Sequence, residues 1–284
     1  MAFYGSYFSF DGVSCRDYNL MVYDFGSSGQ DDTVAFGSTG TAVEDRTANR
    51  YSSFFYGIKQ DRPLTFNLTF GADCCLLEKE RPFQRLEVAR ISSWLTGHNE
   101  WKWLTIEQPD MLFVRYRCYI SALQLITYDG KPWAFSCTVN CDSPYGYLEE
   151  ETTTYEITGS TEIEIVNPGS YHGYYYPRMI IDVSSEAQLG AIRLRNTTDT
   201  TQSFYIVGIP AGDRVLVDGE NQVMTALKLN TNNEYEADES FKPYNSFSKK
   251  FLGLVQGPNQ IVIDRVYGPI TLQIITEFPV DIGA

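Results

Sequence analysis

The run Leu64-Thr-Phe-Asn-Leu-Thr-Phe70 alternates apolar and polar side chains without a break. Successive side chains of a strand point to opposite faces of a sheet, so this run predicts a strand with one dry face and one polar face. Aromatic side chains suit pleated, half-buried surfaces, and they make up 14% of the chain, which also favours sheet over helix.

Working outward from this run, the first half of the chain shows further strand patterns divided by turn residues. The Asp11-Gly12 and Asp129-Gly130 steps are signals for tight turns, and the second is typical of a hairpin. Residues 26–45 are rich in Gly, Ser, Thr and Asp, which predicts an extended loop. The strands predicted in this half are 7–10, 18–25, 51–58, 64–70, 101–106, 112–125 and 133–141.

One helix is predicted, near residues 82–96. Pro82 suits a first helical turn, and an apolar stripe at helical spacing follows it. Gly97 is well placed to end the helix in a left-handed cap. We expect this helix to cover one side of a sheet. The stripe consists of Val88, Ile91, Trp94 and Leu95.

The second half shows only short strands and turns. Glu149-Glu-Glu-Thr-Thr-Thr154 is acidic and rich in Thr, as expected of a linker, so we place a domain boundary near residue 150. The fold class is therefore mainly β, with a β-barrel or β-sandwich domain that carries one helix at 1–150 and a β-sandwich at 151–284. The strands predicted in the second half are 162–166, 179–183, 191–196, 203–207, 214–218, 224–229, 260–265 and 270–277.

The chain is strongly acidic, with a formal net charge of -14 over 284 residues. Such a charge repels nucleic acid held close to the surface, which argues against a DNA-gripping role, although a pore through which DNA slides would suit an acidic protein. No signal peptide and no membrane-spanning stretch are predicted, so we expect folding in a reducing cytoplasm. The six cysteines form no Cys-x-x-Cys pair, which favours free, buried thiols over a disulfide framework or zinc.

The sequence predicts no enzyme, cofactor or metal site. His98 and His172 are the two histidines, and neither lies near a nucleophile-elbow motif. The Gly26-Ser-Ser-Gly29 and Gly37-Ser-Thr-Gly40 segments lack the Gly-Lys-Ser/Thr ending of a phosphate loop. Asp and Glu residues lie mainly in turns, so a carboxylate pair for glycoside hydrolysis is an open but weaker alternative.

A tyrosine cluster is the main candidate for a ligand platform. Such rings could stack on a sugar, or they could pack a loop onto the edge of the sandwich, because tyrosine has an apolar body and a polar tip. We favour packing, since no nearby groove is defined by polar residues. The cluster consists of Tyr171, Tyr174, Tyr175 and Tyr176.

Several segments in order along the first half resemble the distal tail (Dit) proteins of bacteriophages. Phe8-Ser-Phe-Asp-Gly-Val-Ser-Cys-Arg-Asp-Tyr-Asn-Leu20 is similar to the opening of that family, with Asn19 where a Gly is more frequent. Asn tolerates the left-handed conformation that Gly would supply. Phe55-Tyr-Gly57, Trp94-Leu-Thr-Gly97, Tyr116-Arg-Cys-Tyr119 and Trp133-Ala-Phe-Ser-Cys-Thr-Val139 continue the resemblance over about 145 residues. The second half, with Leu194-Arg-Asn196 and Gly257-Pro-Asn259, looks like the galectin-like sandwich that many members carry.

The resemblance implies a structural protein of the virion tail tip, assembled in the host bacterial cytoplasm. It implies a homo-hexameric ring, single or doubled back to back, between a tail tube protein and a tail-tip hub protein. The open centre would admit the tape measure and DNA without specific binding. The second domains would project outward and could carry receptor-binding proteins.

Ring subunits meet head to tail, so each needs two different contact patches and often a segment that reaches its neighbour. We expect the 26–45 loop or a hairpin over 51–70 to be that segment. Two alternatives stay open: a carbohydrate-binding adhesin for the host surface, and a tail-associated glycan hydrolase. The candidate ring-contact residues are Thr33, Phe36, Thr41, Phe54, Phe55, Tyr56, Phe66 and Phe70.

Overall fold

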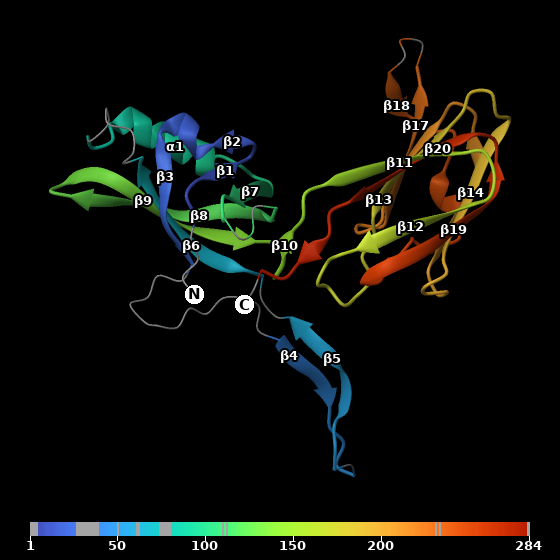
Figure 1. Ribbon diagram of the computed structural model, residues 1–284, viewed down its shortest axis with the longest axis horizontal. Helices are drawn as coiled ribbons and strands as arrows, with labels where there is room; N and C mark the ends of the chain where they lie inside the picture. Colours follow the sequence, from blue (N-terminus) through green and yellow to red (C-terminus); the bar gives the residue numbers. More distant parts are fainter. Residues whose placement is uncertain are drawn as a thin grey trace. The chain divides into compact units, whose positions relative to one another are not determined.

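The computed structural model describes residues 5–26, 40–49, 51–60, 63–73, 81–109, 111, 113–230, 232 and 234–282 (Figure 1). The chain divides into two compact units, with the division between Leu148 and Glu149, and Asp281 and Ile282 belong to the first unit. Both units are built mainly of strands, as the sequence predicts. Within the described residues, no helix is both long and apolar enough to cross a membrane.

The first unit contains one large antiparallel sheet and one separate hairpin. The strand order in the sheet is β2-β1-β7-β8-β9-β6-β3, and β10 pairs with β8. Its strands are β1 (Phe8–Phe10), β2 (Val13–Ser14), β3 (Leu20–Gly26), β6 (Thr65–Ala72), β7 (Lys102–Ile106), β8 (Arg115–Tyr128), β9 (Lys131–Cys141) and β10 (Gly146–Tyr147).

The separate hairpin consists of β4 (Gly40–Asp45) and β5 (Phe54–Gln60), which pair only with each other in the described sheets. Two predictions are corrected here. The end of the loop predicted over 26–45 is a strand, because its Ala42-Val43 pair takes part in a ladder with β5. The hairpin predicted over 51–70 is wrong, because β5 pairs backward with β4 while β6 pairs with β3 and β9.

Strand β6 lies at the centre of the first unit's core, and its alternation is confirmed. Phe66, Leu68 and Phe70 are buried on one face. Phe70 stacks on Phe135 of β9 with ring centroids 5.3 Å apart and meets the ring of Phe8 at 5.2 Å. Strand β6 thus joins two segments, β1 and β9, that are far from it in the sequence.

Among the non-glycine residues with a positive φ, three lie in turns that the sequence predicts. Asp11 (φ 52°) precedes Gly12 (φ 75°) between β1 and β2, and Asp129 (φ 50°) precedes Gly130 between β8 and β9. Two consecutive positive φ angles match the twist of a hairpin, so both Asp-Gly predictions are confirmed. Asn19 (φ 55°) ends the short 3-10 helix η1 (Cys15–Tyr18), as its tolerance for this conformation predicts. The strand predicted over 18–25 therefore begins later, at Leu20.

Helix α1 (Arg85–Thr96) covers the sheet through Ile91, Trp94 and Leu95. The Trp94 indole stacks on Tyr18 (4.7 Å) and on Phe8 (5.6 Å), and its Nε1–H donates to the carbonyl of Phe10 at 3.1 Å. The start of the helix lies after Pro82, because the Gln84 N–H donates to the side chain of Glu87. The predicted left-handed cap at Gly97 is wrong: its φ is -78°, and a glycine is needed there because a Cβ would lie 2.4 Å from the Ser93 carbonyl oxygen.

The second unit contains two antiparallel sheets that pack as a sandwich. Their orders are β11-β20-β13-β16-β17-β18 and β12-β19-β14-β15. Gly190 of β14 lets the sheets approach, because a Cβ there would lie 2.3 Å from the Val183 side chain of β13. The strands are β11 (Glu151–Ile157), β12 (Thr161–Asn167), β13 (Arg178–Val183), β14 (Leu189–Asn196), β15 (Ser203–Pro210), β16 (Arg214–Asp218), β17 (Val223–Leu229), β18 (Tyr235–Ala237), β19 (Gly257–Tyr267), β20 (Ile270–Thr276) and β21 (Pro279–Val280), with a 3-10 helix η2 (Pro243–Asn245).

The prediction of a linker over 149–154 is also wrong. Most of it belongs to β11, whose residues Glu151 to Ile157 pair with β20. Threonine has a high preference for strands, and the acidic side chains lie on an exposed edge. An acidic composition by itself therefore cannot distinguish an edge strand from a linker.

A pair of buried asparagines fastens the second unit. Asn196 of β14 donates to the Asn259 side chain of β19 at 2.8 Å, and Asn259 donates to the carbonyls of Val255 and Gly257 at 2.8 and 2.9 Å. Buried amides are costly unless their donors and acceptors are paired, and these are. The two asparagines that end the motifs Leu194-Arg-Asn196 and Gly257-Pro-Asn259 are therefore in direct contact.

Replacing Phe70 should test the first unit's core. We expect Phe70→Ala to lower the free energy of unfolding of this unit by about 3–5 kcal/mol, through lost apolar burial and a cavity. Tryptophan fluorescence during denaturant unfolding measures it specifically, because all four tryptophans (Trp94, Trp101, Trp103 and Trp133) lie in the first unit.

The matched control is Phe113→Ala, since Phe113 is 55% exposed. An exposed substitution of this kind should change the free energy by no more than about 0.5 kcal/mol. Equal effects of the two substitutions would contradict the central place of Phe70.

Candidate interaction surfaces

The β4–β5 hairpin is the first candidate surface. The described side chains at 41–49 and 51–57 are all exposed or half-exposed, so over these residues neither face of the hairpin is fully buried. Phe55 and Tyr56 are 64% and 69% exposed. A two-stranded hairpin is marginal by itself, and contiguous exposed aromatic side chains mark interaction sites. The hairpin is therefore suited to a partner.

Local chemistry explains why this hairpin forms. The ladder shifts register between Val43 and Glu44, opposite Gly57, whose φ of 130° an L side chain rarely adopts. Ser53 donates to the Glu44 carboxylate at 2.5 Å and holds the two strands where the connecting turn begins. The bulge bends the ribbon and places consecutive aromatic residues of β5 on its surface.

The predicted ring-contact residues are divided by the structure. Thr41, Phe54, Phe55 and Tyr56 lie together on the hairpin and are exposed. Thr33 and Phe36 lie outside the described residues. Phe66 and Phe70 are corrected, because they are 4% and 0% exposed and pack inside their own unit.

A second apolar surface was missed at the far end of the β8–β9 hairpin. Leu125, Ile126 and Tyr128 are 45%, 43% and 79% exposed, although they belong to strands. The signal in the sequence is the failure of alternation: Leu125 and Ile126 are consecutive apolar residues just before an Asp-Gly turn. A register shift between Ile126 and Thr127 accompanies this failure.

The tyrosine cluster is brought together only in part. The rings of Tyr174 and Tyr176 lie 6.3 Å apart, and the Tyr174 hydroxyl donates to Asp199 at 2.6 Å. Tyr175 points the other way: its ring lies 4.6 Å from Phe278, its hydroxyl accepts from the Glu277 N–H, and burial raises its pKa to about 12. Only Tyr171 is well exposed, at 41%. Tyr175 therefore packs the segment, as favoured from the sequence.

The groups that could support catalysis or metal binding have structural contacts. His98 bonds the Trp94 carbonyl through Nε2 at 2.7 Å and lies against Phe10, so it closes the end of α1. Cys15, Cys118, Cys137 and Cys141 are buried free thiols, and burial raises their pKa values, to about 11 for Cys15. Among the described His, Cys, Asp and Glu residues, no group of three could hold a metal ion.

One pair of acids is unusual. Asp213 precedes β16 and Asp238 follows β18, and both are buried, at 7% and 6% exposed. Burial and the neighbouring Asp238 raise the pKa of Asp213 to about 6. Although burial opposes it, hydrogen bonds from Ser240 and Phe241 hold the pKa of Asp238 low. The pair thus makes the second unit sensitive to pH.

Two family models of phage tail proteins match this chain. A family model described as a phage tail protein N-terminal domain matches residues 3–143, and one described as a phage tail C-terminal domain matches residues 145–275. The chain belongs to this family of two-domain phage tail proteins. No curated protein sequence matches it.

Solved structures share its fold at low sequence identity. The Dit protein (gp 19.1) of phage SPP1, described as a paradigm of the hub adsorption apparatus in phages that infect Gram-positive bacteria, matches with a TM-score of 0.61 and 14% identity, over 96% of this chain and 99% of that one. A chain of the phage P2 baseplate in its activated conformation with Ca matches with a TM-score of 0.53 and 8% identity, over 95% and 97%. The same baseplate with Sr gives 0.51 and 9%, over 95% and 98%. The fold is thus that of a Dit-type protein, and the chain is a structural component of a phage tail.

The Asp213→Asn substitution should stabilise the second unit above pH 7. Because the folded-state pKa of about 6 exceeds the ordinary value of 3.8, the stability of the wild type falls as pH rises between about 4 and 6. The amide does not ionise, so the stability of the variant relative to the wild type should rise by on the order of 1–2 kcal/mol across that window. This difference should then stay constant at higher pH. Calorimetry measures this difference in stability. The unfolding of the second unit is the transition that leaves tryptophan fluorescence unchanged, because all four tryptophans lie in the first unit.

Asp199→Asn is the control with the opposite sign. Hydrogen bonds from Tyr174 and Thr201 lower the pKa of Asp199, so its contribution is present above pH 3.8 and is lost as pH falls through the lower folded-state pKa. A gain in stability for both variants at high pH would contradict this assignment.

Proposed function

We propose that six copies of this chain form a ring at the tip of the phage tail, between the tail tube protein and the tail-tip hub protein. The observation that supports this proposal is the β4–β5 hairpin, on which Phe54, Phe55 and Tyr56 are 40%, 64% and 69% exposed. A closed ring has head-to-tail interfaces, so one patch of each subunit meets a different patch of the next. The hairpin supplies one patch, and the β8–β9 tip with Leu125, Ile126 and Tyr128 is a second exposed apolar patch on the same unit.

Charge supports a channel for the tape measure and DNA. With a net charge of -14, the chain repels DNA and would let it slide without specific binding. We infer a structural rather than enzymatic role, in keeping with the bond of His98 to the Trp94 carbonyl at the end of α1. Assembly in the host cytoplasm suits the four described cysteines, which are buried free thiols.

The second unit is proposed to project outward as a galectin-like sandwich. Its two sheets and its Asn196–Asn259 fastening make it a compact body. In that position it offers sheet faces to receptor-binding proteins or to the host surface. The host-surface alternative is favoured by a specific set of residues in this unit, which are taken up below.

The mass of the purified protein tests the ring. Light scattering after size exclusion should give about 193 kDa, six times the chain mass of 32.2 kDa, or twice that value for two rings back to back. The double variant Phe55→Ser, Tyr56→Ser should shift the mass toward 32.2 kDa, because it removes the apolar contact of the hairpin.

Tyr267→Ser is the matched control, since Tyr267 lies in the second unit and is 64% exposed, the same as Phe55. It should leave the mass unchanged. If the hairpin variant kept the wild-type mass above that of a monomer, the hairpin would not be the contact. A wild-type protein that stays monomeric at every concentration would count against a ring that forms from this chain alone.

A further inference from the structure

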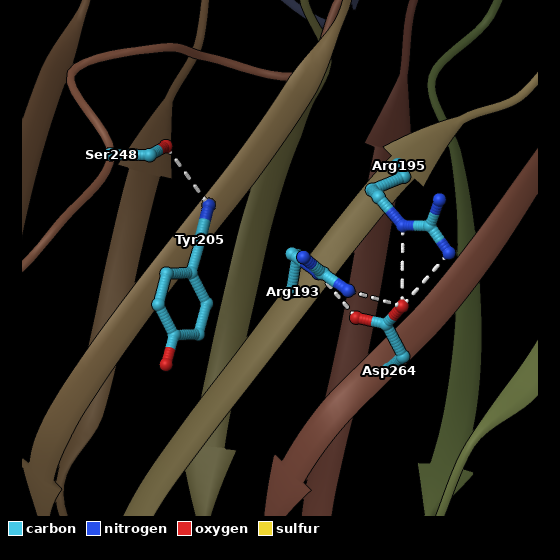
Figure 2. Close-up of polar contacts among 5 residues, drawn as sticks. All are labelled: Arg193, Arg195, Tyr205, Ser248 and Asp264. Carbon is cyan, nitrogen blue, oxygen red and sulfur yellow. Dashed lines mark hydrogen bonds and ion pairs between the residues drawn. The ribbon is translucent and has the colours of Figure 1, made fainter. Parts of the chain in front are cut away.

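The outer face of the four-stranded sheet in the second unit carries a compact polar row. Asp264 of β19, Arg193 of β14 and Tyr205 of β15 are direct neighbours across the three strands. Figure 2 shows Tyr205 beside Arg193, with Arg193 and Arg195 converging on the Asp264 carboxylate. Residues 193 and 195 are two apart on one strand, so their side chains share this face.

The row has an excess of positive charge. Arg193 donates to Asp264 through Nε and through Nη2, the latter at 2.7 Å, and Arg195 donates to the same carboxylate through Nη2 at 2.9 Å. The guanidinium of Arg193 beside it holds the pKa of Asp264 low, so the carboxylate is ionised. Two cations thus share one anion, and one positive charge is left. Arg195 is 44% exposed and is open to a ligand.

A β-bulge adds a third cation to the same face. The β14–β19 register shifts between Ala191 and Arg193, and Arg265 has a φ of 50°. Neighbouring residues at a bulge can turn to one face, and the Arg265 guanidinium lies over the Tyr205 ring, 5.4 Å from its centre. The contacts described for Arg265 include no carboxylate.

The surroundings delimit this basic patch, which we define as Arg193, Arg195, Tyr205, Asp264 and Arg265. In the next row, Tyr267 of β19 lies opposite Ala191 of β14 and is 64% exposed. On the β12 side the sheet is acidic, with Glu162 and Glu164, and Glu164 accepts from Gln260. The positive region is therefore limited to β14, β15 and the bulge of β19.

We propose that the basic patch binds an anionic saccharide, a chain of sugar rings that carries phosphate or carboxylate groups. Guanidinium forks match both anions, and tyrosine rings offer flat apolar faces to sugar rings. A net charge of -14 repels polyanions in general, so this local excess is where an anionic ligand is admitted. Nucleic acid fits less well, because its charges are as dense as one per ~1.7 Å and the acidic β12 edge lies close by.

Within the patch, Asp264 is a positioning residue. Its oxygens accept four hydrogen bonds from the two arginines, which occupies its acceptor capacity. It orients their remaining N–H groups, while Arg265, Arg195 and Tyr205 contact the ligand. This inference does not depend on the ring, because it concerns one face of a single second unit.

The test is binding of the purified full chain to labelled polymers in 0.15 M salt, measured by fluorescence anisotropy. The probes are polygalacturonate, which carries carboxylates, and phosphate-substituted dextran, with unsubstituted dextran as the neutral polymer. We expect one or both charged polysaccharides to bind, and which of them binds identifies the anion. Arg265→Gln and Tyr205→Ala should each weaken binding about tenfold, as expected for the loss of one charge-assisted or stacking contact.

Arg178→Gln is the matched control, because Arg178 lies on the other sheet, is 45% exposed and pairs with Glu150. It changes the net charge equally and should leave binding unchanged. Arg265→Gly, which suits the positive φ, should weaken binding without loss of the calorimetric midpoint, which separates binding from folding.

Three results would overturn the proposal. They are failure of both charged polysaccharides to bind, equal weakening by Arg178→Gln, and binding of polyglutamate or single-stranded DNA as tight as that of the saccharides. The last result would show a patch that responds to charge alone. Each of them leaves the mass measurement of the ring unaffected.

Discussion

A strand pair is stable in water when one of its faces is buried, and the β4–β5 hairpin is the pair in which no described side chain is fully buried. In the core of the first unit, Phe70 of β6 packs on Phe135 and Phe8, and Trp94 of α1 packs on Phe8. The hairpin also carries aromatic side chains, but Phe55 and Tyr56 are 64% and 69% exposed. An isolated two-stranded ribbon is only marginally stable in water, and this is the reason that the hairpin is proposed as the contact between subunits.

The two units solve the burial problem by different means. The first uses stacked aromatic rings and one helix, with Trp94 hydrogen-bonded to the Phe10 carbonyl. The second uses aliphatic faces on two sheets, closed by the buried Asn196–Asn259 pair. Neither means uses a metal or a disulfide among the described residues. On the surface of the second unit, three arginines, Arg193, Arg195 and Arg265, lie on the outer face of the four-stranded sheet.

Charge is spread unevenly over the surface of this protein. The chain as a whole is acidic, yet Arg193, Arg195 and Arg265 lie within reach of one another because a bulge in β19 turns Arg265 to their face. The buried Asp213 and Asp238 are the reverse case, two acids forced together by the fold, with opposite shifts in pKa. Both arrangements join residues that lie 25 or more positions apart in the chain.

The sequence by itself determined the fold class, most strands, the helix face and the left-handed positions Asp11, Asn19 and Asp129, because these depend on local periodicity and on backbone conformation. It also contained the residues of the family resemblance. Only the tertiary structure decided which strand pairs with which, and so that β5 turns back to β4, that 151–157 is a strand, and that Phe66 and Phe70 are core rather than contact residues. Pairing and burial depend on neighbours distant in the chain, and alternation is the same whether a partner lies within the subunit or outside it. The basic patch has the same origin, since no spacing in the sequence brings Arg193 beside Tyr205 and Asp264.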